Sequence, residues 1–236
     1  MGRVVKQVEH AARRKQILDA AQRLIIETKG YEGMSIQDVL DELRISKGAF
    51  YHYFDSKGAL LEALIERMVE EAEPLLIEIV QDAELPALDK LQQFFDRAAR
   101  WKTARKSYLL ALLRIWYADE NAIVRDKLRA SAPQRFSPLL TQIIRQGIRE
   151  GVLTAAYPDQ AGEVVLSLTQ ELGDSFARML LDTDPESSDL DKLASTVAAY
   201  TDAIEHVLGA PAGSLTVVHH ETIREWFEPT PSPVAV

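Results

Sequence analysis

The hydrophobic positions of this chain repeat with a helical period along most of its length. Ile17, Ala21 and Leu24 recur every three to four residues and predict an amphipathic helix over residues 9–28. The same period predicts further helices over residues 35–43, 47–53, from 57 onward, 86–105, 107–118, 121–150, 158–182 and 187–209. Because no stretch shows the sustained alternation of a half-buried strand, we expect an all-α fold.

Two short helices joined by a tight turn, behind a supporting helix, describe a helix-turn-helix. The turn falls at Arg44 and Ile45, between the predicted helices over residues 35–43 and 47–53. Ser35 is placed to cap the first of them, with Asp38 three residues later as an acidic variant of the capping box. The N-terminal part of the chain is therefore expected to be a three-helix unit of this type.

The short helix over residues 47–53 separates its side chains onto two faces. At 100° per residue, Phe50 and Phe54 lie within about 40° of each other and are expected to pack on the preceding helix. Gly48 and Tyr51 lie on a different face, with Lys47 at the helix start. A basic and aromatic face with one glycine suits the major groove of DNA, which admits a single helix.

Composition excludes several classes of protein. The chain has 236 residues and no cysteine, which excludes a disulfide framework, a thiolate zinc site and a cysteine nucleophile. No run approaches the about 20 apolar residues of a membrane span, and the first residues lack the apolar stretch of a secretory signal. We therefore expect a cytoplasmic protein that does not enter a membrane.

Charge is unevenly distributed. Residues 1–57 carry ten basic and eight acidic side chains, whereas residues 58–236 carry seventeen basic and twenty-eight acidic ones. A basic head on an acidic body can approach a polyanion with one end, although a solvated helix face would give the same pattern. The basic residues of the head include Arg3, Lys6, Arg13, Arg14, Lys15 and Arg23.

The stretch Ser46 to Lys57, which reads SKGAFYHYFDSK, resembles the signature of the TetR family of transcriptional repressors. The approach to it, Arg14–Ala21 and Gly30–Ile36, is similar to that family as well, so the resemblance covers about residues 10–68. It implies a helix-turn-helix DNA-binding domain over residues 1–57. A larger helical effector-binding and dimerisation domain would follow over 58–228, and then a flexible tail over 229–236.

The resemblance also implies roles for individual residues. Lys47, Gly48 and Tyr51 would face bases or the adjacent backbone. The full set of implied DNA-binding residues is Ser35, Gln37, Arg44, Ser46, Lys47, Gly48, Tyr51, His52, Tyr53 and Lys57. The family usually has glycine where Arg44 stands, and a left-handed conformation there would cost arginine about 1 kcal/mol. Either the turn is reshaped, or the strain is tolerated and Arg44 itself reaches DNA.

A reader of duplex DNA with this motif usually works as a two-fold dimer, so we expect a homodimer through about residues 158–209. Two apolar stripes could form a four-helix bundle between protomers, although they could equally face the core of one protomer. The stripes consist of Val164, Val165, Leu168 and Leu172, and of Leu193, Val197, Tyr200 and Ile204.

The middle helices carry large apolar side chains and a few polar ones, the usual lining of a small-molecule site. The residues expected to touch an effector are Phe94, Trp101, Tyr108, Leu112, Trp116, Gln170 and Asp174. The alternative is that the aromatic positions are plain core. The resemblance implies that effector binding favours a dimer state that no longer fits its operator; the sequence identifies no effector and indicates no cofactor or metal.

Two other classes of function are an enzyme and a helical binding protein that does not bind DNA. His220 and Glu221 begin like a metalloprotease helix, but Arg224 replaces the second histidine, and the chain has no P-loop, GxGxxG or GxSxG motif. We therefore expect no enzyme. The second alternative is a helical small-molecule-binding or partner-binding protein with an idle DNA-binding head, and Arg44 is the feature in its favour.

Overall fold

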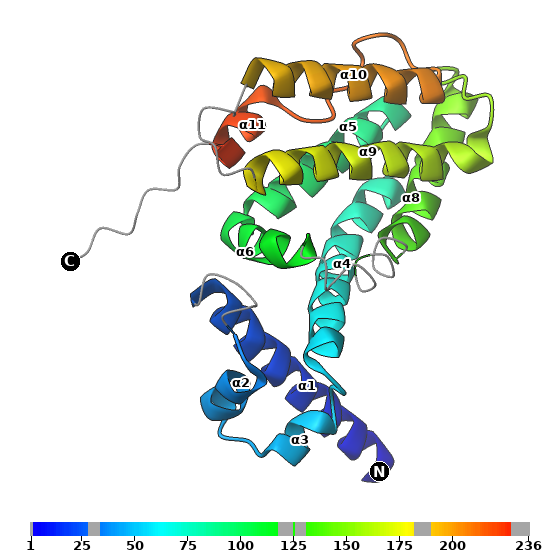
Figure 1. Ribbon diagram of the computed structural model, residues 1–236. Coiled ribbons are helices and arrows are strands. Elements are labelled where there is room, and N and C mark those ends of the chain that lie inside the picture. The colour runs from blue at the N-terminus through cyan, green and yellow to red at the C-terminus, as the bar shows by residue number, and fades with distance from the viewer. Residues whose placement is uncertain (1, 28–33, 118–124, 126–130, 182–189, 228–236) are drawn as a thin grey trace. The chain divides into compact units, whose positions relative to one another are not determined.

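The structure, a computed structural model, describes residues 2–27, 34–117, 125, 131–181 and 190–227 (Figure 1). Helices are the only regular secondary structure in these ranges, which confirms the predicted all-α fold. The predicted tail over 229–236 and most of residues 121–130 lie outside the described ranges.

The helix boundaries follow the predicted ones closely in the middle of the chain and differ at its ends. The first helix, α1, begins at Gly2 rather than near residue 9, and the last, α11, was not predicted at all. The described helices are α1 (Gly2–Glu27), α2 (Ile36–Leu43), α3 (Lys47–Tyr51), α4 (Lys57–Gln81), α5 (Ala87–Thr103), α6 (Lys106–Trp116), α8 (Ser131–Glu150), α9 (Pro158–Leu181), α10 (Leu190–Leu208) and α11 (His220–Phe227).

The contacts within the chain divide it into two compact units. Unit 1 comprises residues 1–71 and 105–132, and unit 2 comprises residues 72–104 and 133–236. The predicted boundary between residues 57 and 58 lies inside unit 1, because it was drawn between expected functions and not between compact units. It stays a prediction.

Unit 1 has its own hydrophobic core. Ile17 and Ile25 of α1, Val39 of α2 and Leu64 of α4 have no exposed surface, and Phe50 of α3 is equally buried among them. At the edge of this core, Arg67 connects α4 to α1: its guanidinium donates to the Asp19 carboxylate of α1 at 2.7 Å and also to Gln22 of the same helix. The helix-turn-helix is thus fixed to α1 and α4 by apolar packing and a cross-helix ion pair.

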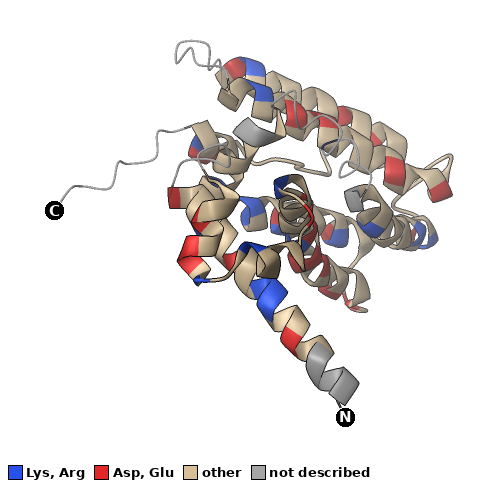
Figure 2. Cartoon of the chain, turned by 60° about the horizontal axis from the view of Figure 1, so that its bottom comes forward, with Lys and Arg blue, Asp and Glu red and all other residues tan. Residues whose placement is uncertain are grey.

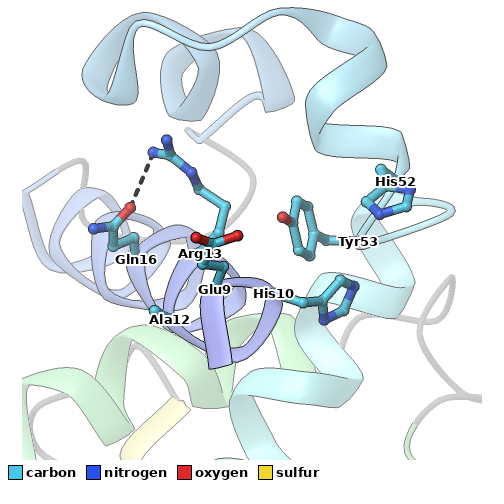
Figure 3. Close-up of a pocket in the computed structure, with 7 residues that line it drawn as sticks. All are labelled: Glu9, His10, Ala12, Arg13, Gln16, His52 and Tyr53. Carbon is cyan, nitrogen blue, oxygen red and sulfur yellow. Dashed lines mark hydrogen bonds between the residues drawn. The ribbon is translucent and has the colours of Figure 1, made fainter. Parts of the chain in front are cut away.

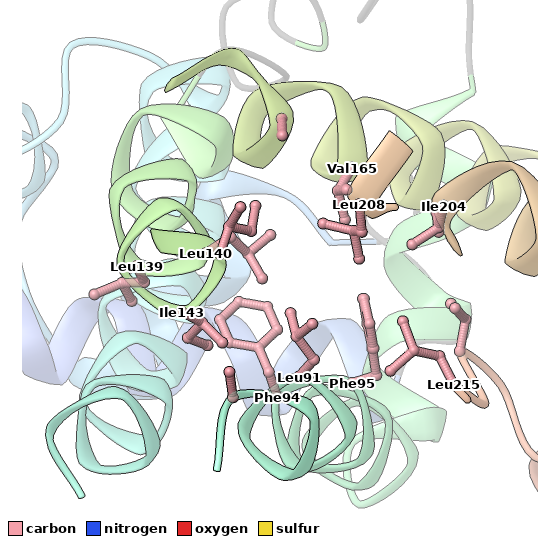
Figure 4. Close-up of a cluster of buried hydrophobic side chains, with 14 of the residues drawn as sticks. Leu91, Phe94, Phe95, Leu139, Leu140, Ile143, Val165, Ile204, Leu208 and Leu215 are labelled. Carbon is pink, nitrogen blue, oxygen red and sulfur yellow. The ribbon is translucent and has the colours of Figure 1, made fainter. Parts of the chain in front are cut away.

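Unit 2 encloses a larger apolar core, part of which Figure 4 shows, with side chains from α5, α8, α9, α10 and the segment after α10. The two apolar stripes predicted for a dimer interface lie mostly here, which corrects that use of them. Val165, Leu172, Leu193, Val197 and Ile204 are buried in this core, and Leu168 and Tyr200 pack against it. A helical period identifies an apolar face but does not tell which surface covers it.

The segment after α10 is held against unit 2 by polar contacts. Glu205 of α10, only 5% exposed, accepts hydrogen bonds from the backbone N–H groups of Gly213 and Leu215, both at 2.9 Å. Gln92 of α5 exchanges two hydrogen bonds with the backbone of Thr216, at 2.8 and 3.0 Å. These bonds direct the chain into α11, whose Ile223 is buried in the core.

None of the described helices is both long enough and apolar enough to cross a bilayer.

Candidate nucleic-acid interface

The helix-turn-helix begins with a complete capping box at α2. The Ser35 hydroxyl accepts the N–H of Asp38, and the Asp38 carboxylate accepts the N–H of Ser35 at 2.6 Å. The Ser35 hydroxyl also donates to this carboxylate at 2.7 Å, and the bonds that the carboxylate accepts, first from the Ser35 backbone and then from the hydroxyl, lower the pKa of Asp38. The box predicted from sequence is confirmed, and it fixes the point at which α2 begins.

The turn between α2 and α3 keeps the left-handed geometry that a glycine would adopt. Arg44 has φ 52° and ψ 45°, and it is the one non-glycine residue with positive φ in the described ranges. The N–H of Ile45 closes the end of α2 on the Leu40 carbonyl at 3.0 Å. The turn is therefore not reshaped; Arg44 tolerates the strain, and its side chain stays exposed.

Replacing Arg44 with glycine should stabilise the protein by about 1 kcal/mol, because glycine adopts this conformation without the steric cost that a Cβ brings. Urea unfolding measures the gain. Arg44→Ala is the matched control, since it removes the same guanidinium but keeps the strained Cβ. A gain of equal size in both variants would show that the charge, and not the backbone, limits stability.

Helix α3 separates its buried and exposed side chains as predicted. Phe50 has no exposed surface and Phe54 only 3%, which confirms that both belong to the core. Tyr51 is 40% exposed, and the Lys47 ammonium lies 5.9 Å from the centre of its ring. The helix ends at Tyr51 rather than at Tyr53, because the Tyr53 N–H turns back to the Phe50 carbonyl.

Most of the predicted DNA-binding residues are open to solvent. Tyr53 and Lys57 are partly buried, and Gln37 donates to Asp41 at 2.7 Å, a bond that it would have to release to reach a base. The Ser46 hydroxyl accepts the Ala49 N–H and so caps α3. The exposed members of the predicted set are Ser35, Gln37, Arg44, Ser46, Lys47, Gly48, Tyr51 and His52.

Gly48 is not required by the packing of the protein itself. A Cβ built at this position would have Ser46 Oγ, 4.0 Å away, as its nearest neighbour outside the local backbone. Its φ is not positive either, since the glycines with positive φ in the described ranges are Gly151, Gly209 and Gly213. The missing side chain therefore leaves space on the outer face of α3, beside Lys47 and Tyr51.

The structure adds two residues that the sequence interpretation did not assign to a site. His10 and Arg13 of α1 line a surface hollow together with the chain just after α3, and Figure 3 shows their side chains around it. Basic residues colour a band of α1 blue in Figure 2. In the sequence, only the basic run Arg13–Lys15 indicated that this part of α1 could bind an anion. The residues that line this hollow, called the His10–His52 hollow below, are Glu9, His10, Ala12, Arg13, Gln16, His52 and Tyr53.

The residues predicted to touch an effector are divided between the two units. Phe94 is 3% exposed in the core of unit 2. Trp101, Gln170 and Asp174 belong to the same unit and are partly buried. Tyr108 and Leu112 are buried in the core of unit 1. Trp116 belongs to the same unit and is partly buried. Burial raises the pKa of the Tyr108 phenol far above its usual value.

The histidines considered for catalysis do not gather with other metal-binding side chains. Within the described ranges no three His, Asp or Glu side chains are close enough together to hold a metal ion. His219 instead lies 2.9 Å from the Asp96 carboxylate of α5, and His220 begins α11.

Two family models of transcriptional regulators match this chain, one in its N-terminal part and one further along. A family model described as "Bacterial regulatory proteins, tetR family" matches residues 17–64, and one described as "Tetracyclin repressor-like, C-terminal domain" matches residues 116–203. An uncharacterised HTH-type transcriptional regulator of Lactococcus lactis is 37% identical over 83 residues, which cover 35% of this chain and 42% of that protein. The HTH-type transcriptional repressor NemR of Escherichia coli is 25% identical over 167 residues, 69% of this chain and 82% of NemR.

Solved structures show the same fold. A TetR-family transcriptional regulator from Pectobacterium atrosepticum aligns with a TM-score of 0.64 at 22% identity, over 86% of this chain and 98% of that one. Reduced NemR of E. coli aligns with a TM-score of 0.55 at 18% identity, over 84% of this chain and 99% of NemR. With a helix-turn-helix inside the first matched segment and helices as the only regular secondary structure in the described part of the second, the chain belongs to the TetR family of DNA-binding transcriptional regulators.

Proposed function

We propose that this protein is a repressor that binds a palindromic DNA operator as a homodimer and is released by a small-molecule effector. The observation that carries the DNA-binding part is the outer face of α3. There Lys47 and Tyr51 are exposed and adjacent, and Gly48 leaves open space that the fold does not use. Base-edge contacts specify a sequence, and a basic residue beside an aromatic one can supply both hydrogen bonds and apolar contact.

Phosphate contacts would position this face on the duplex. Exposed or partly exposed groups surround it: Ser35 at the start of α2, Lys57 at the start of α4, and His52 and Tyr53 just after α3. Arg44 projects from the turn into solvent. Because its backbone keeps the usual turn geometry, the argument for an idle DNA-binding head loses its support.

The experiment that tests the proposal is selection of bound duplexes from a random DNA pool. The native protein should enrich a palindrome, whose half-site spacing reports the dimer, and that operator can then be used to find compounds that release the protein. A folded dimer that enriches no sequence at low salt would overturn the proposed function.

Replacing Gly48 with alanine should weaken operator binding about tenfold while it stabilises α3 by up to about 1 kcal/mol, because alanine favours helix and the protein leaves room for its Cβ. Only a partner that approaches the backbone at this point would be displaced. The measurement is operator affinity beside thermal unfolding of the same variant. Unchanged affinity would show that DNA does not approach Gly48 closely.

The homodimer is proposed through α9 and α10, on the faces that the protomer's core leaves uncovered. Val164 is 40% exposed on α9, and Ala198 and Ala199 are exposed on α10. Small side chains allow two helices to approach closely, which favours packing between protomers. Light scattering should give twice the chain mass, and a monomeric mass would remove this assignment.

The effector site is proposed among the large side chains of the middle helices. One observation supports Tyr108: its buried hydroxyl has no hydrogen-bond partner in the described ranges, so a polar group of a ligand would satisfy it. Tyr108→Phe should therefore alter the effector concentration that releases the operator but not operator affinity itself. Equal release of both proteins would remove Tyr108 from the site.

A further inference from the structure

Residues 7–16 of α1 form a helix without contributing to a core. They are all exposed, and the next residue, Ile17, is buried. Helices in proteins draw most of their stability from packing of an apolar face, and this stretch has none buried. Among its contacts with the rest of unit 1 are those of the His10 ring at the His10–His52 hollow and that of the Arg14 guanidinium, which lies 5.3 Å from the centre of the Phe54 ring.

Three of the side chains that line the hollow carry rings that lie close together. The His10 ring centre lies 4.5 Å from that of Tyr53 and 5.5 Å from that of His52, and the His52 and Tyr53 centres are 5.1 Å apart. The rings connect α1 directly to the chain that follows α3. The hollow therefore begins where the proposed base-reading helix ends.

The lining of the hollow is rich in hydrogen-bond donors. Arg13, Gln16, His10, His52 and Tyr53 can all donate. The Arg13 guanidinium donates to the Gln16 amide oxygen at 2.9 Å, a neutral partner that leaves its charge uncompensated by that bond. By contrast, the neighbouring Lys15 is paired with the Asp19 carboxylate at 2.9 Å. Glu9 is the one acidic residue in the lining.

We propose that the His10–His52 hollow binds a backbone phosphate of the operator, with Arg13 and His10 as donors beside His52 and Tyr53. The inference rests on the proposed function, and it extends the DNA-binding surface from the helix-turn-helix onto α1. A phosphate suits the site because it offers several acceptor oxygens to converging donors and gains a charge-assisted bond from arginine. Such a contact positions the protein on DNA and does not depend on sequence.

Operator affinity, measured over a range of salt concentrations, tests the site. Arg13→Gln should weaken binding about tenfold and lower the salt slope by about 1 for each bound protomer, because one phosphate contact is lost. His10→Ala should weaken binding about fivefold. Glu9→Gln should strengthen it about threefold, because a carboxylate that repels the phosphate is removed. Lys15→Gln is the matched control: it removes a charge from the same helix outside the hollow and should change affinity less than twofold.

A second readout locates the phosphate itself. Ethylation of single phosphates in the operator should identify one whose modification weakens binding of the native protein but no longer affects His10→Ala or Arg13→Gln. The same variants should lose as much affinity for a random duplex as for the operator, unlike a variant of a base-reading residue.

The outcomes separate this inference from the function on which it rests. If Tyr51→Ala and Lys57→Gln lose affinity while the native protein, Arg13→Gln and His10→Ala bind alike, the operator is bound without the hollow and the inference is wrong. Equal losses in Arg13→Gln and Lys15→Gln would also overturn it, because they would reflect net charge alone. If the native protein binds no duplex, both the inference and the proposed function fail.

Discussion

Replacing Tyr51 with alanine should abolish specific operator binding and leave the protein folded. The ring is 40% exposed and makes an edge contact with Phe50, whose own side chain stays fully buried. A lost base contact costs about 1–3 kcal/mol, and a dimer loses two. About a thousandfold weaker operator binding is therefore expected, which approaches the affinity for random DNA.

Lys47→Ala should have a comparable effect on operator affinity, but it should also weaken binding to random DNA, because it removes a positive charge as well as a donor. Tyr157→Ala is the matched control for Tyr51. Tyr157 is 74% exposed in unit 2, so its removal deletes an equally large ring far along the chain from α3. Circular dichroism and urea unfolding should not distinguish these variants from the native protein. Native operator affinity in Tyr51→Ala or Lys47→Ala would exclude the proposed docking of α3.

The parts of the fold that could be predicted from sequence are those specified by neighbouring residues. The capping box at Ser35, the burial of Phe50 and Phe54, and the exposure of Tyr51 each depend on positions within a few residues of one another. Helical period and capping chemistry operate at that range. The helix-turn-helix was therefore predictable almost residue by residue.

The parts that could not be predicted depend on contacts between distant segments or on faces that bury nothing. Residues 7–16 of α1 include no buried apolar side chain, so the hydrophobic period could not indicate this part of the helix. The His10–His52 hollow joins positions more than forty residues apart along the sequence. The stripe containing Val165 was recognised as an apolar face, but only the structure shows that the core of its own protomer covers it.

Helix α11 is the clearest case, because its position depends on bonds from far along the chain. Ile223 is its buried side chain, and one buried position gives no period. The segment that leads to α11 is held by Gln92, 124 residues before Thr216, and by Glu205 on α10. The indole N–H of Trp226 in α11 donates to the Thr103 hydroxyl, and these two residues are 123 positions apart in the sequence. No local pattern encodes such contacts.

Replacing Glu205 with alanine should destabilise unit 2 by about 3 kcal/mol. Both carboxylate oxygens accept backbone N–H groups, from Gly213 and Leu215, and the carboxylate is 5% exposed. Without it, two N–H groups lose their partners, at about 1–3 kcal/mol for each one that stays buried. Because whole domains are stable by about 5–15 kcal/mol, the change should be plain in a urea titration.

Two further variants test whether the loss of stability in Glu205→Ala comes from the lost hydrogen-bond acceptors of its carboxylate. Glu205→Gln keeps the shape and one acceptor oxygen, so it should lose about half as much stability as the alanine variant. Glu163→Ala removes an exposed carboxylate from α9 and should change stability by less than about 0.5 kcal/mol. If Glu205→Ala were as stable as Glu163→Ala, the segment after α10 would be held by its apolar side chains, Leu215, Val217 and Ile223, and the two N–H groups would find water instead. The loss of unfolding free energy in Glu205→Ala thus measures how strongly one buried carboxylate holds the segment that leads to α11.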